Sequence, residues 1–183
     1  MSIKPWKLLR SKFVFDGKWY RLRQDTVKLP DGREVDDYFV SIRPEVVLTF
    51  PVTTEGKAVL VRQYKHGAQK IVLEFPGGVF DPSQETAEAA ALRELAEETG
   101  YTSGKMKFLG ALWDDATKQN NRLHMFLVQD ATHTQAQSLD EIEDIEVVEV
   151  PVSALLGMIR QGELSVSGSV SLAFMGLDAL KEN

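Results

Sequence analysis

Three glutamates, Glu94, Glu97 and Glu98, lie close together in the run RELAEETG. If this run is helical, a rotation of about 100° per residue places their carboxylates on one arc of the helix. Like charges at these spacings repel, and they also lie near the negative end of the helix dipole. We therefore expect a positive group to offset them, and hard divalent cations, which take oxygen ligands, are the natural choice.

An acidic helix face is most often simply solvated, so the flanking residues decide the interpretation. Gly77 and Gly78 precede the run and allow the backbone to approach a ligand closely. Glu85 lies eight residues before Arg93, a spacing that allows an ion pair to fix the intervening loop against the helix. Gly100 follows the run and predicts the end of the helix.

Together these residues form the pattern G-x6-E-x7-R-E-L-x-E-E-x-G-Y, from Gly78 to Tyr101. It resembles the signature of the Nudix hydrolases, G-x5-E-x7-R-E-U-x-E-E-x-G-U, in which U is bulky and apolar. The loop between Gly78 and Glu85 is one residue longer than in that signature. The resemblance implies an α/β fold, namely an α/β/α sandwich with a mixed central sheet. It also implies hydrolysis of a diphosphate linked to a second moiety.

The resemblance further implies a site for Mg²⁺, with Mn²⁺ as the alternative. Its expected ligands are Glu94, Glu97, Glu98 and the backbone carbonyl of Gly77. Metal bound there would hold the phosphates and the attacking water. Four further positions are expected to be structural: Gly78, Glu85, Arg93 and Gly100.

The hydrolysis also needs a general base that activates water. In the ADP-ribose branch of the family, this base is typically a glutamate on a loop downstream of the motif. The matching stretch here is LDEIEDIEVVEV, in which Glu143 is the first choice and Glu141 the second. Other members of the family have the base inside the motif, so Glu97 is an alternative.

Two further stretches resemble the ADP-ribose branch: VRQY at residues 61–64 and LEFPGG at residues 73–78. From this resemblance we expect Arg62 to bind phosphate and Glu74 to reach the distal sugar. Trp6 and Tyr20 could stack on a nucleobase, although packing in a core or a dimer contact explains them equally well.

An N-terminal β-sheet subdomain is predicted for residues 1–43. Residues 12–15, 19–28 and 34–42 read as the strands of an antiparallel meander separated by Asp-Gly turns. Such a small sheet is marginal alone. The resemblance implies that it contributes to a homodimer and to substrate contact.

The Nudix hydrolase domain is predicted for residues 44–183. Its strands are expected at residues 46–52, 57–63, 71–75, 108–113, 122–128 and 145–150. The motif helix begins after either Asp81 or Thr86, both of which are suitable N-caps. Two more helices are expected, at residues 152–160 and 169–180.

Composition narrows the class of protein. A net charge of −6 argues against a dedicated nucleic-acid binder. The chain has no cysteine and no apolar run of about eighteen residues, so we expect a cytoplasmic protein with no membrane segment.

The expected function is Mg²⁺-dependent hydrolysis of ADP-ribose or another nucleoside-diphosphate sugar to a nucleoside monophosphate and a sugar phosphate. The ADP-ribose group usually has a proline shortly after its motif, but none lies between Pro82 and Pro151 here. Other nucleoside-diphosphate sugars, such as GDP-mannose, are therefore further candidate substrates. A house-cleaning (d)NTP pyrophosphatase is the alternative. A non-catalytic nucleotide-sensing module is a weaker alternative, because such modules typically lack the motif glutamates that are present here.

Overall fold

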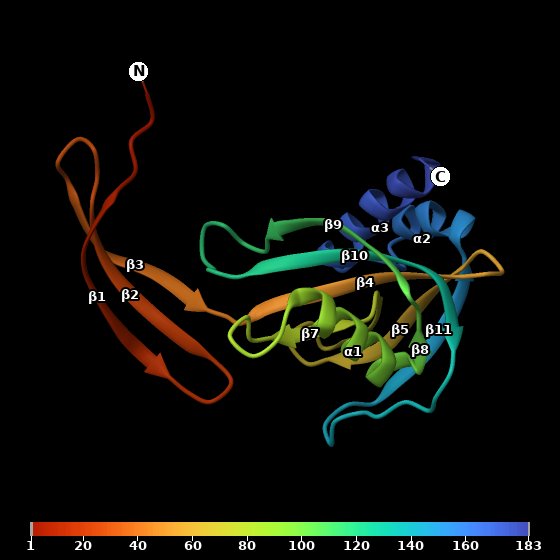
Figure 1. Ribbon diagram of the computed structural model, residues 1–183. Helices are drawn as coiled ribbons and strands as arrows, with labels where there is room; N and C mark the ends of the chain where they lie inside the picture. Colours follow the sequence, from red (N-terminus) through yellow and green to blue (C-terminus); the bar gives the residue numbers. More distant parts are fainter. Residues whose placement is uncertain (1, 183) are drawn as a thin grey trace. The chain divides into compact units, whose positions relative to one another are not determined.

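The computed structural model describes residues 2–182 of the chain. Within these residues, no helix is long and apolar enough to cross a membrane. The chain forms two compact units (Figure 1). The first contains the residues up to Pro44 and Trp113–Arg122, and the second contains Glu45–Leu112 and the residues from Leu123 onward. Residues 113–122 thus belong with the N-terminal residues, although they are far from them in sequence.

The first unit is built on a three-stranded antiparallel sheet in the order β1-β2-β3. Its strands are β1 (Lys7–Asp16), β2 (Arg21–Lys28) and β3 (Glu34–Ile42). The predicted meander is therefore present. β1 begins at Lys7, five residues before the predicted start, because its pairing with β2 continues to Lys28.

The loop at residues 113–122 is attached to the β3 side of this sheet. The Tyr38 hydroxyl donates to the Thr117 carbonyl at 2.6 Å. The Ser41 amide donates to the Lys118 carbonyl at 2.7 Å. Because these partners lie nearly eighty residues apart in the chain, no local sequence pattern indicated the attachment.

The second unit contains, within the described residues, an eight-stranded sheet of mixed direction. β4 and β10 run parallel, and β5 pairs antiparallel with β6 and β11. β7 pairs with β4, and β8 and β9 pair with β10. The strands are β4 (Glu45–Thr53), β5 (Lys57–Lys65), β6 (Lys70–Glu74), β7 (Gly77–Phe80), β8 (Tyr101–Thr102), β9 (Lys105–Trp113), β10 (Arg122–His133) and β11 (Ile145–Pro151).

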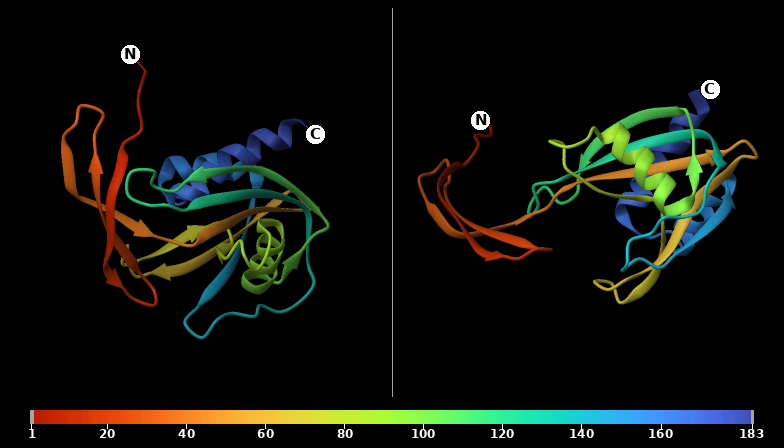
Figure 2. Two further views of the ribbon diagram at one scale, coloured as in Figure 1. Left: turned by 60° about the vertical axis from the view of Figure 1, so that its left-hand side comes forward. Right: turned by 60° about the horizontal axis from the view of Figure 1, so that its bottom comes forward.

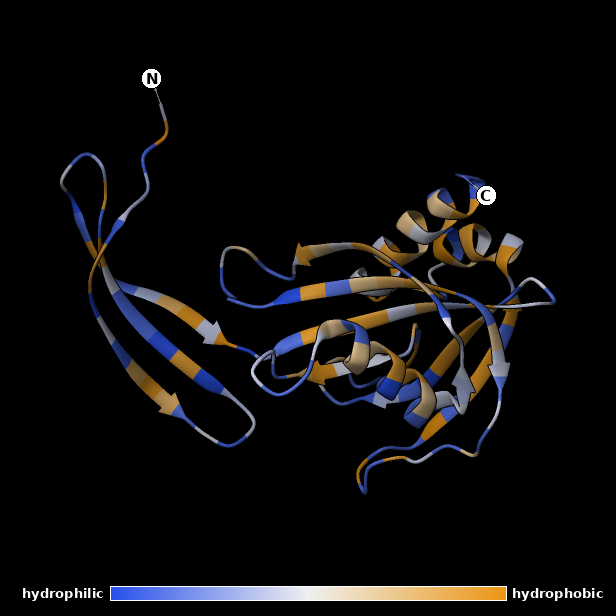
Figure 3. Cartoon of the chain, viewed as in Figure 1, coloured by the Kyte–Doolittle hydropathy of each residue, from blue (hydrophilic) through white to orange (hydrophobic). Residues whose placement is uncertain are grey.

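Helices cover both faces of this sheet, as Figures 1 and 2 show. Successive side chains of a strand point to opposite faces, so each central strand serves two cores. On β4, Val47 packs toward α1 (Ala87–Thr99), whereas Phe50 packs toward α2 (Leu155–Gln161) and α3 (Ser167–Ala179). The apolar residues along these strands are visible in Figure 3. The predicted α/β/α sandwich with a mixed sheet and a small N-terminal antiparallel sheet is confirmed.

Helix α1 begins after Thr86, whose hydroxyl accepts a 3.2 Å hydrogen bond from the Ala89 amide. Asp81 is therefore not the cap. It forms a turn before the helix and accepts a hydrogen bond from the Ser83 amide. The helix ends at Gly100, which has a left-handed conformation with φ 74°.

Two local features of the motif are defined by the structure. Gly77 and Gly78 form the start of β7, because they pair with Leu48 and Val47 of β4. Ala90, Ala91 and Leu95 make the buried apolar face of α1, whereas Leu92 is 37% exposed.

Candidate active site

A cavity of about 300 Å³ lies where β7, α1 and the loop before β11 meet. It brings together residues that are more than sixty positions apart in the chain. Its lining consists of Gly77, Gly78, Val79, Arg93, Glu94, Glu97, Glu98, Ser138, Asp140 and Glu143. All four of the expected metal ligands and two of the three proposed bases, Glu97 and Glu143, therefore share one cavity.

The two glycines let the backbone of β7 lie directly against the acidic face of α1. The Gly77 amide donates a 2.8 Å hydrogen bond to Oε2 of Glu98. A Cβ atom on Gly78 would overlap the carboxyl group of Glu94, and one on Gly77 would overlap the Val47 carbonyl. Glycine is thus required at both positions for this approach.

Arg93 neutralises part of the acidic face. Its guanidinium donates to Glu85 at 2.7 Å, to Glu94 at 2.8 Å and to Glu97 at 3.0 Å. The hydrogen bonds from Arg93 lower the pKa of Glu85, and the same bonds raise the pKa of Arg93. The expected ion pair between Glu85 and Arg93 is present, and it ties the loop before α1 to the helix.

Glu98 is a buried carboxyl group whose charged form is not fully stabilised by its surroundings. The residue is 4% exposed, and burial raises its pKa to about 8. The hydrogen bond from Gly77 opposes this shift, whereas the carboxylates of Glu94 and Glu143 add to it. Burial also raises the pKa of Glu94. Groups with such shifts in a cavity are typical of functional sites.

The chemistry of these donors fits a hard divalent cation, which takes carboxylate and carbonyl oxygens. Among the described residues, no three carboxylate or imidazole side chains are already arranged around a common metal position. Glu94 and Glu97 instead have Arg93 as their cationic partner. The buried, uncompensated carboxylate of Glu98 is the observation that fits an additional positive charge at this site.

The loop before β11 places Glu143, rather than Glu141, in the cavity. Oε2 of Glu143 accepts a 3.0 Å hydrogen bond from the Asp140 amide, and the Glu143 amide donates to the Asp140 carbonyl at 3.0 Å. Ser138 and Asp140 also line the cavity and were not among the predicted site residues. The acidic character of the stretch was the only sequence feature that could have indicated Asp140.

Arg62 and Glu74, the expected substrate contacts, do not line this cavity. Glu74 accepts a 2.9 Å hydrogen bond from Gln63 and pairs with Lys65 at 2.9 Å. Arg62 pairs with Glu146 at 2.8 Å across β5 and β11. Together with Gln63, Tyr64, Ile71, Asp144 and Glu146, Arg62 lines a second cavity of about 270 Å³.

Lys65, the ion-pair partner of Glu74, was not among the predicted site residues. Its positive charge acts to lower the pKa of Glu98, although burial dominates and the pKa is raised.

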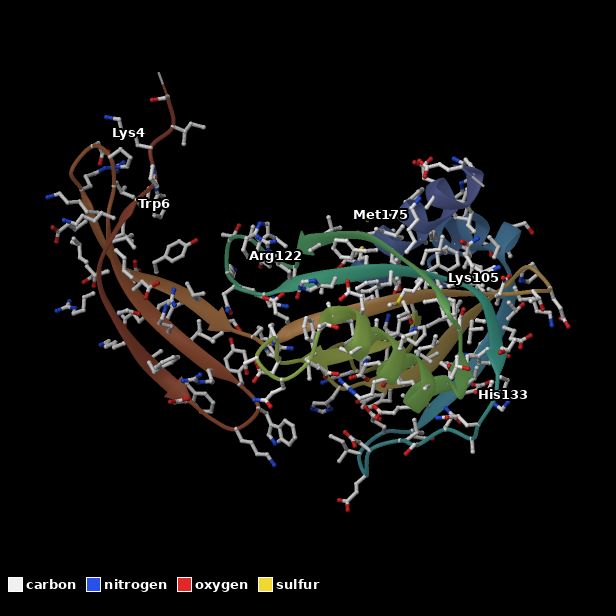
Figure 4. All side chains as sticks on the ribbon, viewed as in Figure 1. Lys4, Trp6, Lys105, Arg122, His133 and Met175 are labelled. Carbon is white, nitrogen blue, oxygen red and sulfur yellow. The ribbon has the colours of Figure 1, made fainter. Side chains whose placement is uncertain are left out.

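Trp6 and Tyr20 belong to the first unit. Trp6, labelled in Figure 4, lies edge-on to Tyr38 with ring centroids 5.7 Å apart and is 51% exposed. Tyr20 lies beside Phe15 and is 43% exposed. Stacking of either ring on a nucleobase stays a prediction.

Comparison with known proteins identifies the family. The family model described as "NUDIX domain" matches residues 42–166, and that described as "Nucleoside diphosphate sugar hydrolase N-terminal domain" matches residues 6–41. An ADP-ribose pyrophosphatase of Bacillus subtilis is 31% identical over 159 residues, which cover 86% of this chain and 85% of that protein. A GDP-mannose pyrophosphatase of Citrobacter koseri is 31% identical over 122 residues, covering 62% of this chain and 63% of that protein.

A solved structure has the same fold. The crystal structure of an ADP compounds hydrolase superposes with a TM-score of 0.88 at 23% identity, covering 100% of this chain and 97% of that one. The match extends over both the N-terminal sheet and the eight-stranded sheet. Since the Nudix domain match spans most of the chain and an acidic helix of the expected spacing lines the cavity, the chain belongs to the Nudix family and is a Nudix hydrolase.

Proposed function

We propose that this enzyme hydrolyses the diphosphate bond of ADP-ribose or another nucleoside-diphosphate sugar, such as GDP-mannose. The reaction would use Mg²⁺, or alternatively Mn²⁺, and would release a nucleoside monophosphate and a sugar phosphate. The observation that carries this proposal is the cavity that Glu143 shares with Glu94, Glu97 and Glu98. The names of the relatives and the match of residues 6–41 support the substrate class.

The motif residues would hold the cation and keep its ligands oriented. Glu94, Glu97, Glu98 and the Gly77 carbonyl would bind the cation, which would supply positive charge to the diphosphate. The Gly77 amide orients the carboxylate of Glu98. Arg93 joins Glu94 and Glu97 to Glu85, and so keeps the helix and the preceding loop in one arrangement.

Glu143 is the proposed general base. It would accept the proton of the water that attacks phosphorus. Its hydrogen bond from the Asp140 amide fixes the direction of the carboxylate, and its charge acts on both Glu94 and Glu98. These interactions support the proposal, because a base at this site has to lie near the carboxylates that would hold the cation.

The substrate beyond the diphosphate would extend toward β5 and β6. We assign Glu74 to the distal sugar and Arg62 to phosphate. Arg62 would then exchange its exposed ion pair with Glu146 for the substrate, an exchange that costs little because exposed pairs contribute about 1 kcal/mol or less. Stacking of Trp6 or Tyr20 on a nucleobase is a separate part of the proposal, supported only by the exposure of their rings.

A homodimer through the N-terminal sheet is part of the proposal. All ten residues of β1 are exposed, including Leu8, Phe13 and Phe15. β1 is also an edge strand of its sheet, and an edge strand with exposed apolar side chains is open to pairing with a second chain. A cytoplasmic location, expected from the lack of cysteine, belongs to the same proposal.

The dimer is tested by light scattering after size-exclusion chromatography. Wild-type protein should have the mass of two chains, and Leu8→Glu should shift it toward one. Phe174→Glu, which changes an equally exposed residue on α3, is the matched control and should stay dimeric. A wild-type monomer would contradict the assignment.

The activity is tested with Mg²⁺ and a panel of ADP-ribose, GDP-mannose, UDP-glucose, diadenosine polyphosphates and dNTPs, with nucleoside monophosphate as the product followed. Diphosphate sugars should be the preferred substrates. Glu143→Gln should lower kcat at least about 100-fold, whereas the matched variant Glu141→Gln should stay near wild type. Preference for dNTPs would contradict the proposed substrate class and favour that of the house-cleaning pyrophosphatases. A large loss of kcat in Glu141→Gln but not in Glu143→Gln would identify Glu141 as the base.

A further inference from the structure

The C-terminal end of α1 is occupied by the segment that leads to Glu143. The last carbonyls of a helix have no partner within the helix and need donors from elsewhere. The carbonyl of Gly100 accepts hydrogen bonds from the amides of Thr134 at 2.9 Å and Gln135 at 3.3 Å. The carbonyl of Glu97 accepts one from the Ser138 amide at 2.9 Å.

Gln137 completes this contact with its side chain. Its Nε2 donates to the carbonyl of Glu98 at 2.6 Å and to the carbonyl of Ile145 at 3.2 Å. A primary amide has two N–H donors, and these two bonds use both of them. The Gln137 side chain therefore joins Glu98, near the end of α1, to Ile145, the first residue of β11.

Gly100 allows the segment to lie this close to the helix. A Cβ atom on Gly100 would overlap the carbonyl oxygen of Gln135 and would approach His133 to 2.9 Å. The close passage is thus a second feature, independent of the hydrogen bonds, that joins the segment to the end of α1.

The geometry points to Gln137 as a positioning residue for catalysis. Its two hydrogen bonds hold together the two ends of the loop at residues 138–144, which contains Glu143. They also attach this loop to the backbone of Glu98. Together with the hydrogen bond from the Ser138 amide to Glu97, the Gln137 side chain then positions the proposed base relative to the carboxylates of α1. This inference rests on the proposed role of Glu143 as the base.

The test compares kcat and KM for ADP-ribose with Mg²⁺ in four proteins: wild type, Gln137→Ala, Glu143→Gln and the double variant. Gln137→Ala should lower kcat about 10- to 100-fold with KM changed less than about 3-fold, because misplacement of a catalytic group by about 1 Å has effects of this size. In the Glu143→Gln background, Gln137→Ala should change kcat less than about 3-fold, because the group it positions is already disabled.

Gln135→Ala is the matched control. Gln135 is an exposed glutamine of the same segment and contacts Gly100 through its backbone amide, which alanine keeps. Its kcat and KM should equal those of the wild type. The increase in Tm on adding Mg²⁺ should be preserved in Gln137→Ala, because the metal ligands are intact. If Gln137→Ala does not fold, Gln137→Asn serves the same comparison, since it keeps the amide but is shorter by one methylene.

Three outcomes would overturn the inference. An equal loss of kcat in both backgrounds would show that Gln137 only stabilises the fold. If Gln137→Ala had wild-type kinetics while Glu143→Gln lost activity, Gln137 would have no positioning role, but Glu143 would stay the proposed base. Wild-type kinetics of Glu143→Gln would reject the proposed base and the inference together.

Discussion

The Gly77 amide donates a 2.8 Å hydrogen bond to the carboxylate of Glu98, and this bond connects β7 to the last turn of α1. Because the donor is a backbone group, the contact depends on close approach of the two chains rather than on a side chain of β7. One such bond does not compensate for the burial of the carboxylate, and its pKa accordingly stays raised, at about 8. A cation bound in the proposed metal site would supply the positive charge that favours the ionised form of this carboxyl group.

Glu98→Gln should abolish most of the turnover and keep the fold. Glutamine retains an oxygen that can accept from the Gly77 amide, but it loses the charge that would bind the cation. Loss of several kcal/mol of transition-state stabilisation corresponds to a decrease in kcat of at least about 100-fold. The measurements are kcat at saturating Mg²⁺ and the far-UV circular dichroism spectrum.

The control for this variant is Glu88→Gln in the first turn of the same helix. Glu88 is exposed and does not line the cavity, so its variant should keep wild-type kcat. Wild-type turnover in Glu98→Gln would remove Glu98 from the metal site.

The stability of the metal-free enzyme should depend on pH through Glu98. Burial raises the pKa of Glu98 from 4.5 to about 8, so the folded state binds this proton more tightly than the unfolded chain. The contribution of Glu98 to stability is then fully present below about pH 4.5 and is lost as the pH rises through about 8. Urea unfolding in EDTA should show wild type losing stability relative to Glu98→Gln across this interval.

Mg²⁺ should reverse that trend. A carboxylate must lose its proton to bind a metal, so Mg²⁺ should bind more tightly as the pH rises toward about 8. The gain in Tm on adding Mg²⁺ should therefore increase over the same interval in wild type and stay flat in Glu98→Gln. A gain that is independent of pH in wild type would contradict the raised pKa.

Gly100→Ala should destabilise the protein more than Gly162→Ala. Both glycines end helices in the left-handed conformation, with φ 74° and 77°, and alanine costs about 1–2 kcal/mol there. Only Gly100 has the Gln135 carbonyl where a Cβ would lie, whereas the space around Gly162 is open. The overlap should add about 1 kcal/mol or more to the loss in free energy of unfolding. Equal losses in urea titrations of the two variants would mean that the segment moves aside without cost.

Arg93→Lys should lower activity although the positive charge is kept. The guanidinium reaches Glu85, Glu94 and Glu97 together, and a single ammonium cannot reproduce this planar fork. Loss of a partner that orients metal ligands typically decreases activity about 10-fold or more. Steady-state kinetics at several Mg²⁺ concentrations measure the effect.

Arg33→Lys provides the comparison for that variant. Arg33 forms an exposed pair with Asp31, and its replacement should leave kcat unchanged. If both lysine variants kept wild-type kinetics, the network around Arg93 would have no role in orienting the ligands.

Local features of the sequence were sufficient for much of the fold and for the acidic helix. The apolar stretches at residues 46–52 and 57–63 indicated the central strands, and the Asp-Gly turns indicated the N-terminal meander, because these patterns depend on neighbours in the chain. The spacing of Glu94, Glu97 and Glu98 predicted one acidic arc, because a helix fixes the direction of each side chain. The ion pair between Glu85 and Arg93 was expected from their spacing, and it forms although Glu85 lies in the loop before the helix.

Only the tertiary structure decided which partners these elements have. It placed Glu143 rather than Glu141 in the cavity, attached residues 113–122 to the N-terminal sheet, and brought Gln137 onto the end of α1. Each of these outcomes depends on hydrogen bonds between residues about forty to eighty positions apart, or on the path of an irregular loop. Local propensity contains no information on such contacts, because they form only when the packed sheet brings distant segments together.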